Sequence, residues 1–403
     1  MKILVFSSLY PNNVWPNNGI FIKERVKNVL SLNGADIKVV APVPYFPPLK
    51  ISSRWAFSQV VQQERCDDMD VFHPRFFMTP KIGMSTYGWM MYRSVLSTVK
   101  KLHQQFDFDL IDAHYIYPDC YAAILLGRYF NKPVIVSARG SDINQFTTFP
   151  IIRKLINFTL DNADHVVAVS RALKDVMVNL GVPPEKISVI PNGVDQEKFS
   201  PLDKKIAMQR LNLPEGKIIF SAGTLRRLKG FDILIHSVRK ILTKSRDKRI
   251  YLIIAGEGKV RQDLESLIVQ HSLGEHVHLV GAKSQDDLKL YYNAADVFCL
   301  ASSREGWPNV IMEALACGTP VVATNVGGIP EIITSDRLGM LAKRHPDDFS
   351  EQIETALNKT WDHQYISTHM QDYTWNRIAS ALSHQFESVL GEKKEPSLIE
   401  EQL

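Results

Sequence analysis

Short apolar runs of strand length and amphipathic helix patterns alternate along almost the whole chain, and this alternation restricts the fold more than any other feature. In the first half the strand patterns are Ile3–Ser7, Ile37–Ala41, Leu110–Ala113, Val134–Ala138, Val166–Val169 and Ile187–Ile190. The helix patterns between them are Phe21–Leu32, Tyr87–Gln105, Cys120–Phe130, Ile151–Asn162 and Arg171–Leu180. Alternation of this kind buries a parallel sheet between two layers of helices.

The same alternation starts again in the second half of the chain. Its strand patterns are Ile218–Ala222, Tyr251–Ala255, Val277–Val280, Val297–Leu300, Pro320–Ala323 and Gly339–Leu341. Helix patterns near Phe231–Leu242, Val260–Gln270, Gln285–Ala294, Val310–Cys317 and Asp347–Asn358 separate them. Between the halves, Pro191-Asn192-Gly193-Val194-Asp195 has the composition of a linker. We therefore expect two doubly wound, Rossmann-like α/β domains, 1–195 and 196–374, facing one another across a cleft.

Composition and cysteine usage exclude several classes of protein. A chain with 45% hydrophobic and 22% charged residues is not disordered, and a net charge of +4 is too small for a nucleic-acid-binding surface. The excess still fits an enzyme that handles anions or visits an acidic membrane surface. No apolar run reaches the ~18 residues that span a bilayer, and the first residues lack the pattern of a signal peptide. We expect a cytoplasmic protein whose four distant cysteines stay reduced.

One segment follows a buried strand pattern that ends near Leu300, and it combines two carboxylates with a helix start at about Asn309: Glu305-Gly306-Trp307-Pro308-Asn309-Val310-Ile311-Met312-Glu313-Ala314. Backbone N–H groups in a first helical turn have no partner inside the helix, so they form an anion site suited to a diphosphate. Glu305 and Glu313 are too far apart to share a proton, but they can accept hydroxyl hydrogen bonds from two parts of one ligand. Alternatively, Glu305 is a surface residue and Glu313 favours the helix N-terminus electrostatically.

A glycine-bounded basic segment follows the first strand pattern of the second half: Gly223-Thr224-Leu225-Arg226-Arg227-Leu228-Lys229-Gly230. Cations at the carboxyl ends of parallel strands lie where they can neutralise phosphate. The alternative is an ordinary basic connection between a strand and a helix.

Together, E-x7-E after a strand and G-x-L-x-x-x-K-G upstream resemble the retaining, nucleotide-sugar-dependent glycosyltransferases of the GT-B fold, group 1 or family 4. Other segments similar to this family follow in order along the chain: Tyr10-Pro11 with Asn18–Ile22, Asp112–Tyr115, Ala138–Asp142, Val189–Asp195, Ala255–Gly258, Val280-Gly281, Ala316–Ala323 and Tyr373–Trp375. The resemblance implies a GT-B enzyme of EC class 2.4 whose C-terminal helix, about 375–403, crosses back onto the first domain.

The resemblance also implies a role for individual residues. Arg226 and Lys229 bind the diphosphate of the donor, Glu305 holds the donor sugar, and Glu313 holds the ribose. The other donor-binding residues it implies are Gly19, Gly223, Glu257, Gly281 and Ala282, with the amides of Asn309, Val310 and Ile311. Retention is explained by front-side attack, in which the departing phosphate takes the proton of the acceptor hydroxyl. No protein base and no metal cofactor are then needed.

Two positions depart from the family pattern. Thr224 stands where the family often has an arginine, so Arg226 or Arg227 must supply the second cation. Arg139 stands where the family often has a histidine, and an arginine is no base near neutral pH. Arg139 is better suited to anchoring a phosphate or an acidic acceptor. His114 and Asp142 are the other acceptor-side candidates, although His114 fits equally well as a structural histidine at a strand end.

We expect transfer of a sugar from a UDP- or GDP-sugar to a hydroxyl of a glycan or lipid-linked acceptor, in bacterial surface polysaccharide or glycolipid synthesis. The alternative is a non-catalytic nucleotide-sugar-binding scaffold of the same fold. The first turn between strand and helix has no G-x-G-x-x-G, which argues against a dinucleotide oxidoreductase. Asp68-Met69-Asp70 and Asp107-Phe108-Asp109 match a metal-binding D-x-D string, but neither lies at the expected site, so we expect no metal.

Three further segments are open to two interpretations. Val43–Phe57, rich in proline, aromatic and basic residues, is either a packed connection or a loop that meets the acceptor or a membrane. The helix Tyr87–Gln105 either packs on the core or rests on an anionic bilayer through Met90, Met91, Tyr92, Arg93, Lys100 and Lys101. The basic run Lys240, Lys244, Arg246, Lys248 and Arg249 is interpreted as a solvated face.

Overall fold

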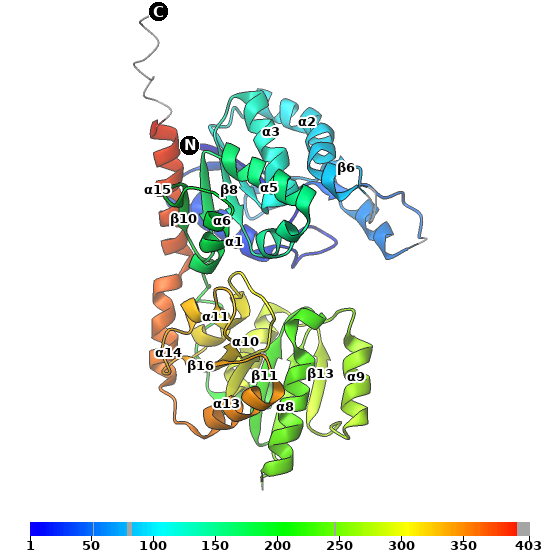
Figure 1. The fold of residues 1–403 in the computed structure, drawn as a ribbon, viewed down its shortest axis with the longest axis vertical. Coiled ribbons are helices and arrows are strands. Elements are labelled where there is room, and N and C mark those ends of the chain that lie inside the picture. The colour runs from blue at the N-terminus through cyan, green and yellow to red at the C-terminus, as the bar shows by residue number, and fades with distance from the viewer. Residues whose placement is uncertain (51, 79–82, 246, 393–403) are drawn as a thin grey trace, which may run out of the picture. The chain divides into compact units, whose positions relative to one another are not determined.

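The chain forms two compact units, which Figure 1 shows as ribbons. The computed structural model describes residues 1–50, 52–78, 83–245 and 247–392. Unit 1 consists of Met1–Asn192 and Trp375–Leu403, and unit 2 of Gly193–Thr374. The expected boundaries after residues 195 and 374 lie close to this division. Parts of the segments singled out above fall outside the described residues, namely Ile51, Arg246 and 393–403 of the C-terminal segment.

Unit 1 is built on an eight-stranded sheet of order β10-β9-β8-β7-β1-β2-β5-β4. Its strands are β1 (Lys2–Phe6), β2 (Asp36–Val40), β4 (Gln63–Cys66), β5 (Met69–Phe72), β7 (Leu110–His114), β8 (Val134–Ala138), β9 (His165–Ala168) and β10 (Ile187–Val189). They pair in parallel except for β4 with β5. Its main helices are α1 (Ile20–Asn33), α2 (Tyr87–Gln105), α3 (Tyr121–Phe130), α5 (Pro150–Asn162), α6 (Arg171–Asn179) and α15 (Trp375–Glu392).

The expected strands and helices of unit 1 are confirmed to within a residue or two, and a side chain caps the start of α6. The Ser170 side chain accepts a hydrogen bond from the amide of Leu173 at 3.2 Å. The structure adds elements that we did not expect: the β4–β5 hairpin, the short pair β3 (Val43–Pro44) and β6 (Arg75–Phe76), and the 3-10 helix Ser53–Gln59. These elements are short, and outside β5, where Met69 and Val71 alternate as buried residues, most of their residues are exposed or half-buried, so the sequence shows little apolar periodicity there.

Helix α15 belongs to unit 1, although it follows unit 2 in the chain. Ile378, Leu382 and Phe386 of α15 share a buried core with Ile22 and Val26 of α1. Trp375 and Val389 belong to the same core. This packing confirms the predicted return of the C-terminal helix to the first domain. Within the described residues, no helix has both the length and the apolar character needed to cross a membrane.

Unit 2 is built on a six-stranded parallel sheet of order β13-β12-β11-β14-β15-β16. Its strands are β11 (Lys217–Ala222), β12 (Ile250–Ala255), β13 (Val277–Gly281), β14 (Val297–Leu300), β15 (Val321–Thr324) and β16 (Gly339–Ala342). Its main helices are α7 (Lys204–Arg210), α8 (Phe231–Lys244), α9 (Arg261–Gln270), α10 (Gln285–Ala294), α11 (Asn309–Ala316), α13 (Pro346–Asn358) and α14 (His363–His369).

Helices cover both faces of the unit 2 sheet. Residues of α8, α9 and α13 form one core with alternate residues of the strands, among them Leu252, Val297 and Val322. On the opposite face, Phe220 of β11 stacks on Tyr291 of α10, with ring centroids 5.2 Å apart. The chain order of the strands reverses between β11 and β14. In doubly wound sheets, ligands bind outside the carboxyl ends of the two strands at such a reversal.

Candidate active site

The two strands at the reversal in unit 2 each lead into one residue of a close ion pair. Lys229 follows β11 and Glu305 follows β14, and Lys229 Nζ lies 2.6 Å from Glu305 Oε1. The side chains are 21% and 12% exposed, so the pair is shielded but still reachable. Ser302, in the loop after β14, donates its hydroxyl hydrogen bond to the same carboxylate oxygen at 2.6 Å. The structure therefore brings together two residues 76 positions apart that the sequence assigned to one site.

Glycines in the loops after β11 and β12 leave space and allow close backbone contact near this pair. Gly223 directly follows β11, and a Cβ added there would meet no atom nearer than 3.8 Å, with Lys229 Cε at 4.0 Å. Gly256 follows β12, and a Cβ added there would lie 1.9 Å from the Gly223 carbonyl oxygen. Gly223 thus leaves open space beside Lys229, and Gly256 allows the two loops to touch.

Glu257 and Gly281, both predicted to lie on the ribose or base side of the donor, are neighbours. A Cβ added to Gly281 would lie 3.3 Å from Glu257 Oε1, and Ala282 continues directly from Gly281. The Glu257 carboxylate is held by Arg261 Nη1 at 2.7 Å. These residues follow β12 and β13, so they share the sheet edge with Lys229 and Glu305.

Glu313 lies one turn inside α11, and its carboxylate is fixed by a neighbouring helix. The Tyr292 hydroxyl of α10 donates to Glu313 Oε2 at 2.7 Å, and Tyr292 itself is fully buried. Burial raises the pKa of the Glu313 carboxyl group to about 7. Only Oε2 has this bond, so Oε1 is the oxygen that could accept a ligand hydroxyl.

The first turn of α11 carries the three amides predicted to meet a phosphate. Pro308 is the N-cap residue and no side chain caps the turn. The amide of Ile311 already donates to the Pro308 carbonyl at 3.1 Å, whereas Asn309 and Val310 precede it at the very start of the helix. Because its amide is engaged within the turn, Ile311 is a poorer candidate for contact with an anion than Val310.

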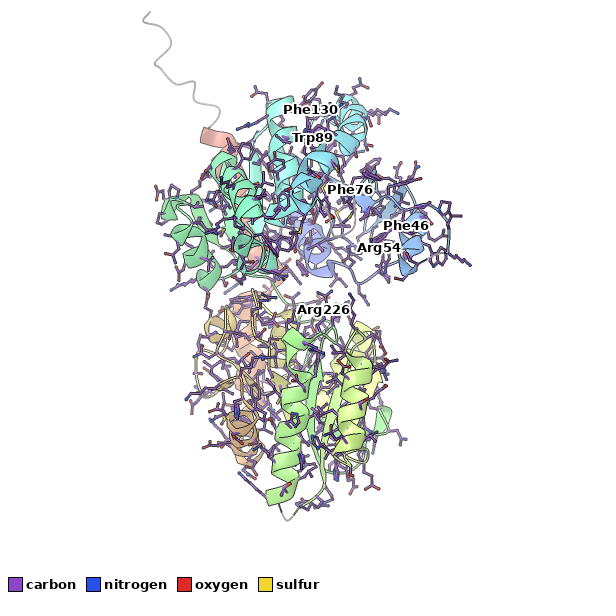
Figure 2. The ribbon with its side chains drawn as sticks, turned by 45° about the vertical axis from the view of Figure 1, so that its right-hand side comes forward. Phe46, Arg54, Phe76, Trp89, Phe130 and Arg226 are labelled. Carbon is purple, nitrogen blue, oxygen red and sulfur yellow. The ribbon has the colours of Figure 1, made fainter. Side chains whose placement is uncertain are left out.

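Arg226 and Arg227, the predicted second cations, point into another part of unit 2. Arg226 lines a cavity beside α8 together with Phe231, Leu264 and Arg344, and Figure 2 shows it at the end of the unit from which α8 starts. Arg227 is 88% exposed and lies 3.5 Å from Asp263. The Lys229 amide donates to the Arg226 carbonyl at 2.9 Å, but among the described residues no side-chain hydrogen bond or ion pair joins either arginine to Lys229 or Glu305. The role of Arg226 at the diphosphate stays a prediction.

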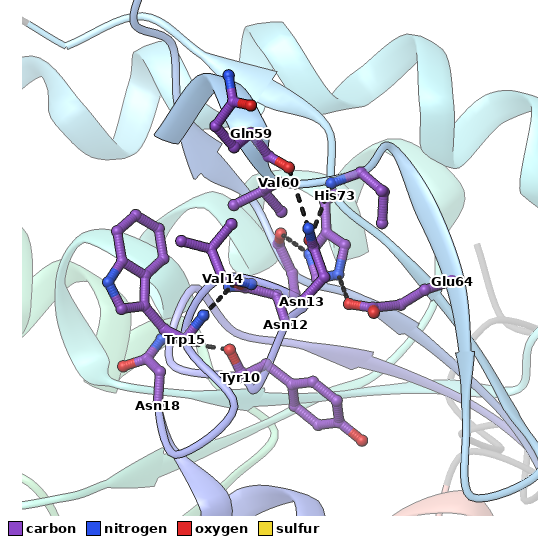
Figure 3. A network of polar contacts seen from close by, with 12 residues as sticks. Tyr10, Asn12, Asn13, Val14, Trp15, Asn18, Gln59, Val60, Glu64 and His73 are labelled. Atoms are coloured by element: carbon purple, nitrogen blue, oxygen red, sulfur yellow. Dashed lines mark hydrogen bonds and ion pairs between the residues drawn. The ribbon is translucent and has the colours of Figure 1, made fainter. Parts of the chain in front are cut away.

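In unit 1 the corresponding reversal lies between β1 and β7, and the loop after β1 is firmly braced. Asn12 Oδ1 accepts from the amides of Val14 and Trp15 at 3.0 Å, and Asn18 Nδ2 donates to the Tyr10 carbonyl at 3.2 Å (Figure 3). The loop ends at Gly19, with φ +64°, where an added Cβ would lie 2.2 Å from the Leu9 carbonyl oxygen. The backbone of the loop itself therefore requires a glycine at this position.

His114 ends β7 and is fully buried. Arg139 donates from Nη2 to His114 Nδ1 at 2.7 Å, so His114 carries its proton on Nε2, which lies 3.3 Å from Asp112 Oδ2. Burial lowers the pKa of His114 to about 4, and the ring is neutral at pH 7. His114 is buried and neutral, and its Nδ1 already accepts a hydrogen bond from Arg139. It therefore cannot contact the acceptor substrate. Its place is behind Arg139, which also donates to Asn192 Oδ1 at 3.1 Å and remains partly exposed.

Asp142 is also fully buried, and its carboxylate is engaged by backbone. It accepts from the amides of Ile116 at 2.9 Å, Arg139 at 3.1 Å and Gly140 at 2.7 Å. It therefore shapes the turn that carries Arg139. Of the three acceptor-side candidates, Arg139 alone is not fully buried.

Comparison with known proteins identifies the family. Residues 203–371 match the family described as glycosyl transferases group 1, and residues 71–198 match glycosyltransferase family 4. The chain belongs to the group 1 glycosyltransferases. A Bacillus subtilis protein named as a teichuronic acid biosynthesis glycosyltransferase, TuaC, is 26% identical over 406 residues, which cover 96% of this chain and 99% of that protein.

Two solved structures agree with this fold. Sucrose-phosphate synthase from Thermosynechococcus elongatus superposes with a TM-score of 0.78 at 18% identity, over 97% of this chain and 99% of the other. Anabaena HepE in complex with UDP-glucose superposes with a TM-score of 0.71 at 18% identity, over 96% of this chain and all of the other. The GT-B fold expected from the motifs is thereby confirmed, and the glycosyltransferase is an enzyme of the transferase class.

Some groups around these sites in the glycosyltransferase were not predicted from its sequence. Tyr292 and Ser302, which fix Glu313 and Glu305, lie on other elements and match no motif. Arg25 on α1 is 1% exposed, and its Nη2 lies 3.9 Å from Asp112 Oδ1. An arginine among Ile22, Val26 and Val29 on one face of a helix was a signal that could have been noticed.

The two D-x-D strings of the glycosyltransferase lie away from the sites described above. Asp70 pairs with Lys38 at 3.1 Å and Asp107 with Lys132 at 2.8 Å. Within the described part of the chain, no three His, Cys, Asp or Glu side chains gather as ligands for a metal ion.

Proposed function

We propose that this enzyme moves a sugar from a nucleoside-diphosphate sugar, with UDP as the first candidate, to a hydroxyl of a glycan or lipid-linked acceptor, with retention of configuration. The observation that carries the proposal is the Lys229–Glu305 pair at the strand reversal of unit 2. The relative named for teichuronic acid synthesis and the neighbour bound to UDP-glucose support it. The relative named for teichuronic acid synthesis also supports a setting in surface polysaccharide or glycolipid synthesis, and we place that setting at the cytoplasmic face of the membrane as part of the proposal.

In the proposed mechanism, Lys229 exchanges its carboxylate partner for the donor diphosphate. The bond between the anomeric carbon and the diphosphate oxygen breaks while the acceptor oxygen bonds to that carbon on the same face. The acceptor proton passes to the departing phosphate oxygen. Lys229 stabilises the negative charge that develops on the diphosphate, which is the largest contribution that the protein makes.

Glu305 and Glu313 hold the two sugars of the donor in this proposal. Glu305, released from Lys229, accepts hydroxyl bonds from the transferred sugar and stays oriented by Ser302. Glu313 accepts from the ribose through Oε1, while Tyr292 keeps Oε2 occupied. Arg226 would add positive charge near the diphosphate only by turning away from the cavity beside α8 that its side chain lines. Because Lys229 supplies the charge that a divalent cation would bring, we propose that transfer is independent of metal.

Thermal stabilisation by UDP, GDP, ADP and their sugars, with and without EDTA, tests the proposal. One nucleotide should stabilise the wild type, EDTA should leave the shift unchanged, and Lys229→Ala should abolish it and lower turnover at least ~100-fold. A wild-type-like nucleotide response and turnover in Lys229→Ala would overturn the assignment of the site. A shift that disappears in EDTA would overturn metal independence alone.

We further propose that unit 1 contacts an anionic membrane. No Asp or Glu occurs from residue 37 to 63 or from 71 to 106. Tyr45 and Phe77 directly follow the paired strands β3 and β6 and are 54% and 55% exposed. Trp89, labelled in Figure 2, is 53% exposed, and the Arg93 guanidinium lies 5.8 Å from its ring centroid. Met91, named above for this contact, is instead buried in the core.

Vesicle co-sedimentation tests the membrane contact. Wild type should bind phosphatidylglycerol vesicles and not phosphatidylcholine vesicles, and 0.5 M salt, a concentration at which the screening length is below ~5 Å, should weaken the binding. Arg93→Gln with Lys100→Gln, both exposed on α2, should reduce it several-fold. Lys205→Gln with Arg210→Gln on α7 of unit 2 is the matched control. Equal loss in both double variants would contradict a specific contact through α2.

A further inference from the structure

Two cavities along helix α8 of unit 2 adjoin one another at His236. The first, of about 710 Å³, is lined by residues from the loop after β11, from α8 and α9, and by Arg344. The second, of about 560 Å³, is lined by the later turns of α8 together with His345 and Pro346. We name the two together the α8 groove. At 1.5 Å per residue, the 14-residue helix α8, along which the groove runs, is roughly 20 Å long.

Positive charge dominates the lining of the α8 groove. Acidic side chains in the lining are Asp232 and Asp263. The cations are Arg226, Arg227, Arg239, Lys240, Lys244 and Arg344, and His236 and His345 add titratable rings. The whole chain carries a net charge of +4, so an excess of this size in one groove is a strong local concentration.

Few of these cations are neutralised by the protein. Arg227 pairs with Asp263, and Lys240 pairs with Asp347. Arg344 donates to two backbone carbonyl oxygens, of Ala301 at 3.0 Å and of Arg227 at 3.2 Å, which fix its guanidinium without cancelling its charge.

The side chains of Arg239 and Lys244 make no hydrogen bond or ion pair among the described residues. Burial lowers the pKa of the nearby His271, and the positive charge of Arg239 and the His236 ring lower it further.

The floor of the first cavity is apolar. Leu228, Phe231, Val260, Leu264 and Leu267 line it, so the groove combines an apolar floor with a cationic rim. A flat bilayer does not enter a groove, whereas a linear chain can lie along it. Sugar rings present C–H faces to an apolar floor, and acidic substituents at their edges would reach the arginines and lysines.

We propose that the α8 groove binds an acidic glycan chain, one that carries carboxylate or phosphate groups, at a site separate from the Lys229–Glu305 pair. The site holds the chain on the enzyme and takes no part in bond making. Only the choice of a glycan as the ligand rests on the proposed function; the groove and its charge do not depend on it. It gives the basic residues Lys240 and Lys244, which the sequence left as a solvated face, a binding role.

Calorimetric titration with a galacturonic acid hexamer, a linear glycan with one carboxylate per ring, tests the groove. Isomaltohexaose is the uncharged match. We expect the wild type to bind the acidic hexamer and not the neutral one. Arg239→Gln with Lys244→Gln should weaken binding at least ~10-fold. Lys205→Gln with Arg210→Gln, exposed cations on α7 outside the groove, should change it less than ~2-fold.

Several results would overturn the inference. These are equal losses in the two double variants, equal binding of the neutral hexamer, or equally tight binding of a single-stranded oligonucleotide of the same length. The nucleotide-dependent thermal shift, measured on the same samples, separates this proposal from the proposed function. A normal shift without glycan binding defeats the groove alone. Glycan binding without any nucleotide shift defeats the proposed donor site and leaves the groove standing.

Discussion

The carboxyl group of Glu313 is shielded from water between α10 and α11, and this shielding changes where it ionises. Burial raises its pKa to about 7, whereas an unfolded chain would release the proton near the ordinary value of 4.5. Between pH 4.5 and pH 7, Glu313 is therefore mostly ionised in the unfolded chain and still mostly protonated in the folded protein. Rising pH therefore lowers the free energy of unfolding of unit 2 through this window, and the full cost is present above pH 7.

Glu313→Gln removes this cost while keeping an oxygen that can accept from Tyr292. At pH 8 the variant should be more stable than the wild type by on the order of 1–3 kcal/mol, and the difference should vanish near pH 4. Denaturant unfolding at a series of pH values measures it. Stability curves that run parallel from pH 4 to pH 8 would contradict the raised pKa. If Glu313 binds ribose, the same variant should also show a smaller nucleotide-dependent thermal shift.

For single residues, the sequence predicted which side chains belong to the site better than it predicted the residues that contact them. Lys229 and Glu305 were predictable because motif residues after adjacent parallel strands must meet at one sheet edge. Tyr292 was not, because its contact with Glu313 depends on how α10 and α11 pack, and no local pattern encodes that packing. The basic segment after β11 predicted Arg226 at the donor site, whereas in the structure its side chain lines the cavity beside α8.

At the scale of elements, the turns that follow the strands of unit 2 are held by backbone-to-backbone contacts. The Gly223 amide donates to the Ala255 carbonyl at 3.0 Å, and the Gly256 amide donates to Gly281 at 2.8 Å. Gly256 has φ +147°, a conformation that residues with a side chain rarely adopt. The close approach of Gly256 to the Gly223 carbonyl oxygen therefore sets the shape of the loop that leads to Lys229.

Gly256→Ala should therefore disturb the loop after β11, because its Cβ would overlap the Gly223 carbonyl oxygen. We expect unit 2 to lose more than about 1 kcal/mol of stability and the nucleotide-dependent thermal shift to fall sharply. Gly274→Ala is the control, since an added Cβ there meets nothing within 4 Å. The two variants are compared by denaturant unfolding and by nucleotide titration. Equal behaviour of the pair would contradict a tight contact between the loops.

The elements that sequence analysis found are those with a buried periodicity. Strands β8 and β14 and helices α2 and α10 have the predicted bounds. The hairpin β4–β5 was missed because β4 is half-exposed throughout and its tight turn at Asp67 and Asp68 has positive φ at both residues. Helix α14 was missed because it buries Ile366 and little else.

At the scale of the whole chain, each unit has its own core, and the two chain crossings between the units lie side by side. The amide of Val194 donates to the Tyr373 carbonyl at 2.8 Å, close to both crossing points. Unit 1 is completed by α15, which the chain adds only after unit 2. The stability of unit 1 therefore depends on the last helix, whereas the core of unit 2 is made of its own residues.

This organisation predicts different effects for two matched core substitutions. Phe386 of α15 is 1% exposed in the unit 1 core, and Phe349 of α13 is fully buried in the unit 2 core. Each phenylalanine-to-alanine change should cost about 3–5 kcal/mol. Hydrogen exchange measured by mass spectrometry should show lost protection in β1 and α1 for Phe386→Ala, with β11 and β12 unchanged, and the reverse for Phe349→Ala.

The pattern of exchange also tests whether the units unfold separately. Loss of protection throughout the chain in both variants would show one cooperative unit and contradict the division. Selective loss in unit 1 with Phe386→Ala would make the C-terminal helix an integral part of the first domain's core. Because the donor contacts assigned above come from unit 2 residues, apart from the backbone at Gly19, Phe386→Ala should then keep nucleotide-dependent protection around Lys229 and Glu305, whereas Phe349→Ala should lose it.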